Sequence, residues 1–114
     1  MKIKLSRHRF RKNQLGRFLG HSSVLHSDIF SIFYSKQSPS SYAFVCAKKL
    51  GSAPLRNKIK RQLKEAFALL SCHVQPDISL VIMAKKKIMQ STFKNTHDML
   101  LLHLKKKRII NDNN

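Results

Sequence analysis

An amphipathic helix that follows Pro54 is the feature that most constrains how this chain can fold. Apolar residues recur there at i, i+4, i+7, i+8 and i+11, which is the spacing of one helical face: Ile59, Leu63, Ala66, Phe67 and Leu70. Polar and cationic residues project away from that face: Asn57, Lys60, Arg61 and Lys64. Because Pro54 disfavours a helical conformation at the residue before it, the helix is expected to begin between residues 55 and 57. One side of this helix can pack on a core while the other presents positive charge.

A basic loop leads into this helix. Lys48 and Lys49 precede Gly51, which predicts a loop over residues 48–53. The stretch from residue 48 to 67 holds seven of the 23 Lys and Arg residues and a single acid, Glu65. The expected order is a strand end, a basic loop and a helix N-terminus. It places backbone N–H groups beside cationic side chains, which suits phosphate oxygens.

The charge of the whole chain supports an anionic partner. A chain of 114 residues is the size of one domain, and its formal net charge is +18. Such a charge repels itself unless an anion binds, so nucleic acid is favoured over an anionic membrane surface or an acidic protein. The N-terminus is basic, and no apolar run approaches the ~20 residues that span a bilayer. We therefore expect a cytoplasmic protein with no membrane segment, in which Cys46 is a buried free thiol.

The remaining elements are predicted from composition and periodicity. A basic arm or short helix covers residues 1–18, three strands cover 28–34, 42–47 and 77–84, and a last helix covers 92–107 with Ser91 or Thr92 as N-cap. The last helix has an apolar stripe: Phe93, His97, Leu100, Leu101 and Leu104. A short connection predicts an antiparallel hairpin between the first two strands, and the apolar run 77–84 predicts a central strand. The unit from 42 to 84 suits a crossover between parallel strands. The prediction is one α+β domain over residues 1–110, with a frayed tail over 111–114.

No catalytic or metal-binding constellation is apparent. The five carboxylates are scattered along the sequence: Asp28, Glu65, Asp77, Asp98 and Asp112. The six histidines have no metal-ligand spacing: His8, His21, His26, His73, His97 and His103. These patterns indicate a chain that binds polyanions and does not cleave them itself.

The basic stretch resembles a specific family signature. It follows the pattern S-K-K-x-G-x-A-x-x-R-N-x-x-K-R-x-x-R-E of the protein subunit of bacterial ribonuclease P. The matching positions keep their spacing without a gap: Lys48, Lys49, Gly51, Ala53, Arg56, Asn57, Lys60, Arg61 and Glu65. Three positions depart from the pattern or its usual residues: Ala47 for Ser, Pro54 for a β-branched residue and Lys64 for Arg.

The resemblance implies a fold, a reaction and partners. The fold would be one mixed sheet of about four strands packed with helices, like the second domain of a small-subunit ribosomal protein, with a left-handed βαβ crossover. The protein would assist a catalytic RNA subunit, with Mg²⁺ bound mainly by that RNA, in removing the 5′ leader from precursor tRNA. Residues implied for binding the RNA subunit are Lys48, Lys49, Arg56, Asn57, Lys58, Lys60, Arg61 and Lys64.

The resemblance also implies a leader-binding group. Its members are Arg11, Lys12, Phe18, Phe33 and Tyr34. Because Phe33 and Tyr34 fall on opposite faces of a strand, at most one of them should face the leader. The main alternative is a non-catalytic RNA-binding protein of ribosomal type. A DNA-binding regulator is a second alternative, but no recognisable helix-turn-helix or zinc spacing supports it. A membrane-active basic peptide is a third, and the predicted strands argue against it because they indicate a packed domain.

Overall fold

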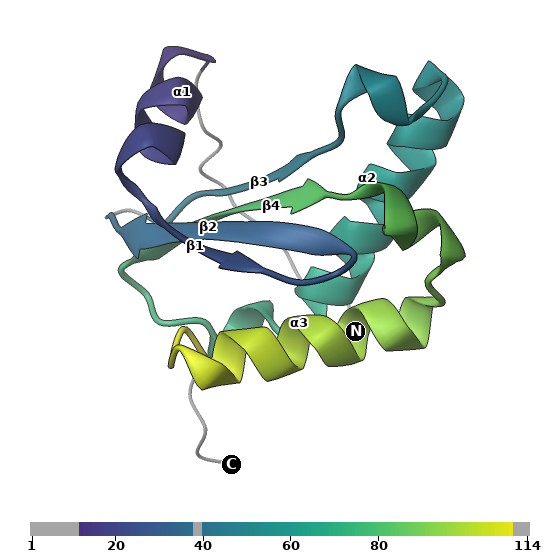
Figure 1. Cartoon of the computed structure of the whole chain (residues 1–114). Coiled ribbons are helices and arrows are strands. Elements are labelled where there is room, and N and C mark those ends of the chain that lie inside the picture. Colours follow the sequence, from purple (N-terminus) through teal and green to yellow (C-terminus); the bar gives the residue numbers. More distant parts are fainter. Residues whose placement is uncertain (1–11, 38–39, 111–114) are drawn as a thin grey trace.

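The computed structural model describes residues 12–37 and 40–110, which build one four-stranded sheet with three α-helices (Figure 1). In chain order the elements are α1 (Lys12–His21), β1 (Ser23–His26), β2 (Phe30–Lys36), β3 (Tyr42–Val45), α2 (Ala53–Ala68), β4 (Ile78–Ala84) and α3 (Phe93–Lys106). Short 3₁₀ turns are η1 (Lys48–Leu50), η2 (Ser71–His73) and η3 (Lys86–Gln90). The predicted arm before residue 12 and the predicted tail 111–114 lie outside the described residues. Within the described ranges, no helix is long and apolar enough to cross a bilayer.

The sheet order is β1-β2-β4-β3, so the predicted hairpin between the strands at 28–34 and 42–47 is wrong. Strand β4 lies between them, antiparallel to β2 and parallel to β3. Five connecting residues can reach about 16 Å, more than the roughly 10 Å of two strand spacings, so the chain can leave a gap for a third strand. The gap is filled by the most apolar strand, whose central position was predicted.

The crossover from β3 through α2 to parallel β4 is confirmed, but α2 begins earlier than predicted. Its first residue is Ala53, inside the stretch expected to be a loop, and η1 forms one turn in the same stretch. Ser52 is the N-cap, and Pro54 lies in the first turn, where the missing N–H has no helical partner to lose.

Strand β1 was not predicted. The strand has only four residues, two of them polar, so its sequence carries no clear strand pattern. It is ordered by pairing with β2, from Ser23 opposite Tyr34 to His26 opposite Ser31. The other strands differ from the predicted ranges by two residues or fewer at every end.

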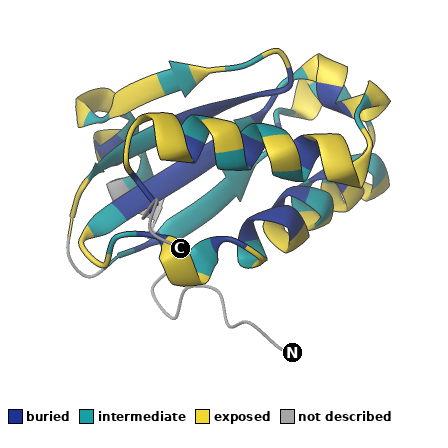
Figure 2. Ribbon diagram, turned by 90° about the horizontal axis from the view of Figure 1, so that it is seen from below, coloured by how far each residue is buried: buried dark blue, intermediate teal, exposed yellow. Residues whose placement is uncertain are grey.

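The core lies between the sheet and the helices α2 and α3. The predicted stripe of α2 is buried in full: Ile59, Leu63, Ala66, Phe67 and Leu70. At its centre the Phe67 ring meets the Tyr42 and Phe44 rings of β3 edge-on, at centroid distances of 5.0 and 5.8 Å. Figure 2 shows the inward faces of both helices buried and their outward faces exposed.

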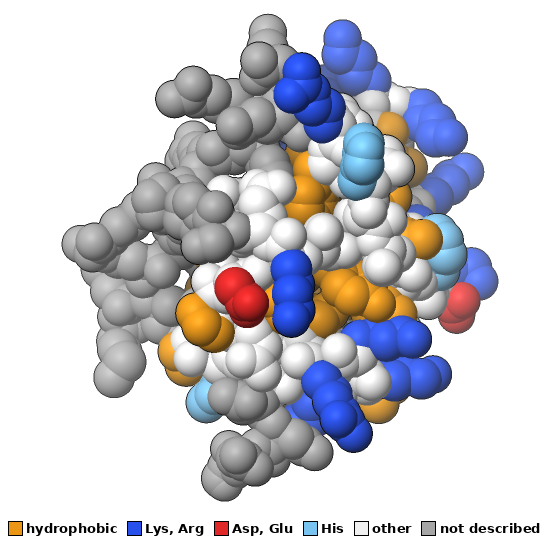
Figure 3. All heavy atoms as spheres, turned by 90° about the vertical axis from the view of Figure 1, so that its left-hand side faces the viewer, with side chains coloured by type: hydrophobic (Ala, Val, Ile, Leu, Met, Phe, Trp, Pro, Cys, Tyr) orange, Lys and Arg blue, Asp and Glu red, His pale blue; other side chains and the backbone are white. Residues whose placement is uncertain are grey.

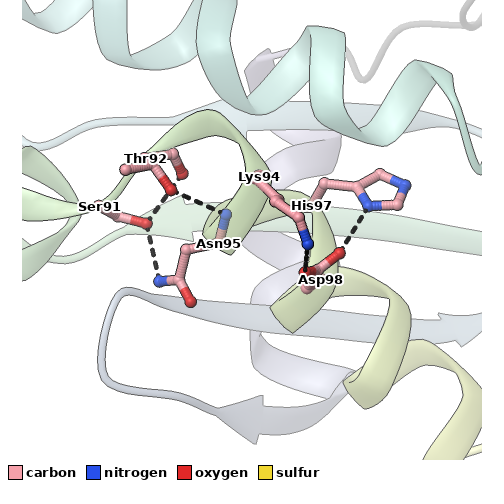
Figure 4. A network of polar contacts seen from close by, with 6 residues as sticks. All are labelled: Ser91, Thr92, Lys94, Asn95, His97 and Asp98. Atoms are coloured by element: carbon pink, nitrogen blue, oxygen red, sulfur yellow. Dashed lines mark hydrogen bonds and ion pairs between the residues drawn. The ribbon is translucent and has the colours of Figure 1, made fainter.

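Helix α3 begins at Phe93, one residue later than predicted, with Thr92 as N-cap, and its stripe is partly different. Phe93 is 40% exposed, whereas Thr96 is fully buried with Leu100 and Leu104. Figure 4 shows how the helix is capped: Thr92 Oγ1 accepts the Asn95 backbone N–H at 3.0 Å, and the Asn95 amide donates to Ser91 Oγ.

Next to this cap, Asp98 accepts hydrogen bonds from the His97 ring and from Lys94 (Figure 4). The His97 contact and then the Lys94 contact hold the pKa of the Asp98 carboxyl below its ordinary value. The Asp98 carboxyl is exposed, so these contacts add little to stability.

The C-terminus of α3 closes in a Schellman motif without glycine. The Arg108 N–H donates to Lys105 O at 3.0 Å, and the Ile109 N–H donates to Leu104 O at 2.9 Å. Arg108 holds a φ of 57°, the left-handed conformation that costs a non-glycine residue about 1–2 kcal/mol. The buried side chains of Leu104 and Ile109 complete the motif.

We expect Phe67→Ala to lower the free energy of unfolding by about 3–5 kcal/mol, because it empties the contact between α2 and β3. The matched control is Leu69→Ala on the same helix end, where the side chain is 52% exposed and the expected change is within about 0.5 kcal/mol. Urea denaturation of both variants measures the difference, and equal losses would contradict the docking described above.

Candidate nucleic-acid interface

Helix α2 carries cationic residues on the side opposite its buried stripe. We call the surface formed by η1 and α2 the basic α2 surface, with the members Lys48, Lys49, Arg56, Asn57, Lys58, Lys60, Arg61 and Lys64. Arg56 and Lys60 are partly buried, and the other members are exposed. The residues predicted to bind an RNA subunit therefore lie on η1 and along α2, outside the buried stripe of that helix.

A tight turn fixes the two lysines of η1 against the start of α2. Ser52 Oγ accepts the Leu55 N–H at 3.4 Å, and the Arg56 guanidinium donates from Nε to Gly51 O at 3.1 Å. Gly51 has a φ of 154°, and a Cβ there would lie 2.6 Å from Leu55 Cδ2. Only glycine fits this turn without a shift, so the match of Gly51 to the signature has a steric reason.

The positive charge of the basic α2 surface is not neutralised within the described residues. The ion pairs among the described residues are those of Asp98 on α3 with Lys94 and His97. None of the Lys or Arg side chains of the basic α2 surface pairs with a described carboxylate. Beneath the surface, burial raises the pKa of the Cys46 thiol, while the nearby charges of Arg56 and Lys60 oppose that rise. Cys46 is a buried free thiol, as predicted.

A second candidate surface lies on the face of the sheet away from α3. Val24, Phe33, Val81 and Ala43 stand side by side on four strands, because their register partners follow one another across the sheet. Helix α1 lies over this side of the sheet, and the start of α2 rises on the same side (Figure 1). This face of the sheet and the start of α2 therefore lie on the same side of the molecule (Figure 1).

The leader-binding residues predicted from the sequence are separated by the structure. Phe18 is 5% exposed and lines a hollow of about 310 Å³ with Arg17, His21, Ser35 and Gln37. Phe33 is half-buried two residues before Ser35 and on the same face of β2, whereas Tyr34 packs on the opposite face against the core. Phe18 is therefore almost completely covered and does not offer an open ring for stacking.

The other two predicted leader residues are less informative. Arg11 lies outside the described residues, and Lys12 is the first residue of α1. Sequence reasoning assigned no specific role to Arg17, His21 or Gln37. The helical period of α1 offered a signal for two of them, since Arg17 and His21 are four residues apart and so share one side of the helix.

Within residues 12–37 and 40–110, no three His, Cys, Asp or Glu side chains gather into a possible metal site. The arrangement can bind phosphates and stack bases, and its described part offers no carboxylate cluster for cleaving RNA.

Comparison with known proteins agrees with this arrangement. The family model described as Ribonuclease P matches residues 6–108. The ribonuclease P protein component of Brevibacillus brevis is 26% identical over 107 residues, which cover 90% of this chain and 85% of the relative. That of Alkaliphilus metalliredigens is 25% identical, with 92% of this chain and 97% of the relative covered.

Two solved structures have the same fold. The Staphylococcus aureus RNase P protein superposes with a TM-score of 0.80 at 24% identity, covering 93% of this chain and 100% of that one. The Thermotoga maritima RNase P protein gives 0.77 at 24% identity, covering 88% and 97%.

We expect Gly51→Ala to lower the free energy of unfolding by about 1–3 kcal/mol, because it adds a Cβ against Leu55 and forces a φ that alanine rarely adopts. Gly16→Ala is the control, since no atom lies within 4 Å of the added Cβ and alanine favours the helix by up to about 1 kcal/mol. Thermal and urea melts should move in opposite directions for the two variants. A neutral Gly51→Ala would contradict the steric account of the turn.

Proposed function

This chain belongs to the ribonuclease P family and is a protein component of that tRNA-processing ribonucleoprotein, and we propose that its basic α2 surface binds the RNA subunit of the enzyme. One observation carries the proposal: the signature's Lys and Arg residues lie on η1 and α2 outside the buried stripe of the helix, and within the described residues none of them has a carboxylate partner. Phosphates of a folded RNA are the anions that such a rigid row of cations fits.

We propose further that the 5′ leader of precursor tRNA lies on the sheet face beside α1. Phe33 supplies an aromatic surface for an unpaired base, and Arg17, next to Phe18 in the hollow, supplies a positive charge for the backbone. Stacking on aromatic side chains tolerates any base, which suits leaders that differ in sequence.

In this proposal, hydrolysis of the phosphodiester belongs to the RNA subunit and its bound Mg²⁺. The described carboxylates of the protein do not gather into a site that fits the metal. The chain's own residues bind and orient: a formal charge of +18 reduces the repulsion between two RNA molecules and so lowers the Mg²⁺ concentration at which they associate.

Reconstitution tests the proposal. The full chain is mixed with a bacterial ribonuclease P RNA and a precursor tRNA at low Mg²⁺, and cleavage at the mature 5′ end is followed with wild type, Arg61→Ala and Lys64→Ala. Each variant should weaken binding to the RNA subunit roughly 3- to 10-fold, because each removes one charge-assisted contact.

The matched control is Lys94→Ala, which removes the same charge from an exposed position on α3. If wild type binds RNA without stimulating cleavage, the chain acts as a ribosomal-type RNA-binding protein and the proposal fails. If Lys94→Ala weakens binding as much as Arg61→Ala, the charge matters but the basic α2 surface does not.

A further inference from the structure

A pocket of about 570 Å³ opens at the end of the sheet where β2 ends, β4 begins and α3 terminates. Figure 3 faces this end of the molecule and shows Lys and Arg side chains set around hydrophobic ones. Tyr34, Lys36, Asp77, Lys107 and Arg108 line the pocket. None of the residues assigned above to the basic α2 surface takes part in it.

The lining combines the groups that hold a nucleotide. Tyr34 and Ile78, both half-buried, provide apolar surface for a base, and cationic side chains lie around them for a phosphate. The Asp77 carboxylate provides an acceptor for the amino group of a base.

The walls of the pocket are tied together by backbone hydrogen bonds. The Gln37 N–H donates to Asp77 O at 2.9 Å, joining the end of β2 to the start of β4. The Gln75 N–H donates to Ile109 O at 2.9 Å, and Val74 pairs with Ile110 beside it, which joins the segment after α3 to the same edge. The pocket is therefore formed before any ligand enters.

Arg108 occupies a position where glycine would fit better. Its left-handed φ of 57° is the conformation that most Schellman motifs assign to glycine. Strained residues of this kind concentrate where a side chain has a function, and Arg108 is exposed and lines the pocket. A binding role for the Arg108 guanidinium in the pocket would explain why arginine, and not glycine, occupies this strained backbone position.

The electrostatics of the site favour an anion despite the helix end. The C-terminus of α3 carries a dipole charge of about −0.5. Three cationic side chains, Lys36, Lys107 and Arg108, face one carboxylate, Asp77, which gives a local formal charge of +2. The side chains therefore outweigh the dipole.

The pocket also continues the proposed leader surface. Ser35 lines both this pocket and the hollow beneath α1 that contains Phe18. A single strand of RNA that passes over Phe33 and Ser35 can reach the pocket around the C-terminal end of β2.

We propose that this pocket, which we call the strand-end pocket, binds one unpaired nucleotide of RNA, with the base against Tyr34 and the phosphate at Lys36, Lys107 and Arg108. The proposal rests on the proposed function, because it takes RNA as the partner. The nucleotide comes from the precursor leader or from the RNA subunit, and the experiment separates the two sources.

The test compares Arg108→Gly and Lys36→Gln with Lys106→Ala, which removes a charge from the same helix end outside the pocket. Two affinities are measured for each full-length variant: that of the protein for ribonuclease P RNA, and that of the assembled holoenzyme for precursors with and without a leader. Arg108→Gly should weaken one of these affinities about 3- to 10-fold while its melting temperature stays unchanged or rises. A loss confined to leader-bearing precursor assigns the leader, and a loss in assembly assigns the RNA subunit.

A second measurement locates the contact. A short single-stranded oligoribonucleotide added to the isotope-labelled full chain should shift the backbone amide signals of Gln75, Asp77 and Ile78 and of residues 107–109, and a duplex of the same sequence should not. The proposal is overturned if these signals stay fixed while those of α2 shift, or if Arg108→Gly matches Lys106→Ala in both affinities. Failure of wild type to stimulate cleavage at all would instead overturn the proposed function.

Discussion

The docking of α2 on β3 through Phe67 is the interaction on which the rest of the structure depends. It buries the apolar stripe of the helix and thereby turns its cationic side outward. It also closes the crossover between two parallel strands, which brings β4 into the centre of the sheet. A helix held this firmly can carry many like charges, because the repulsion between them is small against the burial of Leu63, Ala66 and Phe67.

Two strained turns stand next to cationic clusters. Gly51 precedes α2 with a φ that few side chains adopt, and Arg108 follows α3 with a left-handed φ. At the turn before α2, glycine adopts the unusual φ without strain, and the cationic residues lie on either side of it. At the turn after α3, the cationic residue Arg108 itself has the strained φ. That difference is the reason for assigning a binding role to Arg108 and a structural role to Gly51.

The sequence predicted α2, its two sides and the central position of β4, because helical period and apolar runs are local signals. It failed at the pairing of β2 and β3, since a five-residue connection is compatible both with a hairpin and with a strand inserted between. It also missed β1, whose order comes from its partner. The handedness of the crossover came from the family resemblance alone.

The candidate site divides in the same way. The helical period predicted Asn57, Lys60, Arg61 and Lys64 as one group, and the family resemblance added the other members of the basic α2 surface, which lie on η1 and α2. The strand-end pocket joins β2, the segment before β4 and the end of α3, which are far apart in the sequence, so no local pattern could announce it. Opposite faces for Phe33 and Tyr34 were predicted from strand alternation and are confirmed.

The central claim is that α2 docks with one side and binds the RNA subunit with the other. Quantitative acetylation of lysines, read by mass spectrometry with and without ribonuclease P RNA, tests it most directly. The account predicts that bound RNA protects the lysines of the basic α2 surface, Lys48, Lys49, Lys58, Lys60 and Lys64, and that Lys94 on α3 stays reactive. Protection of Lys94 with unchanged reactivity along α2 would contradict the account.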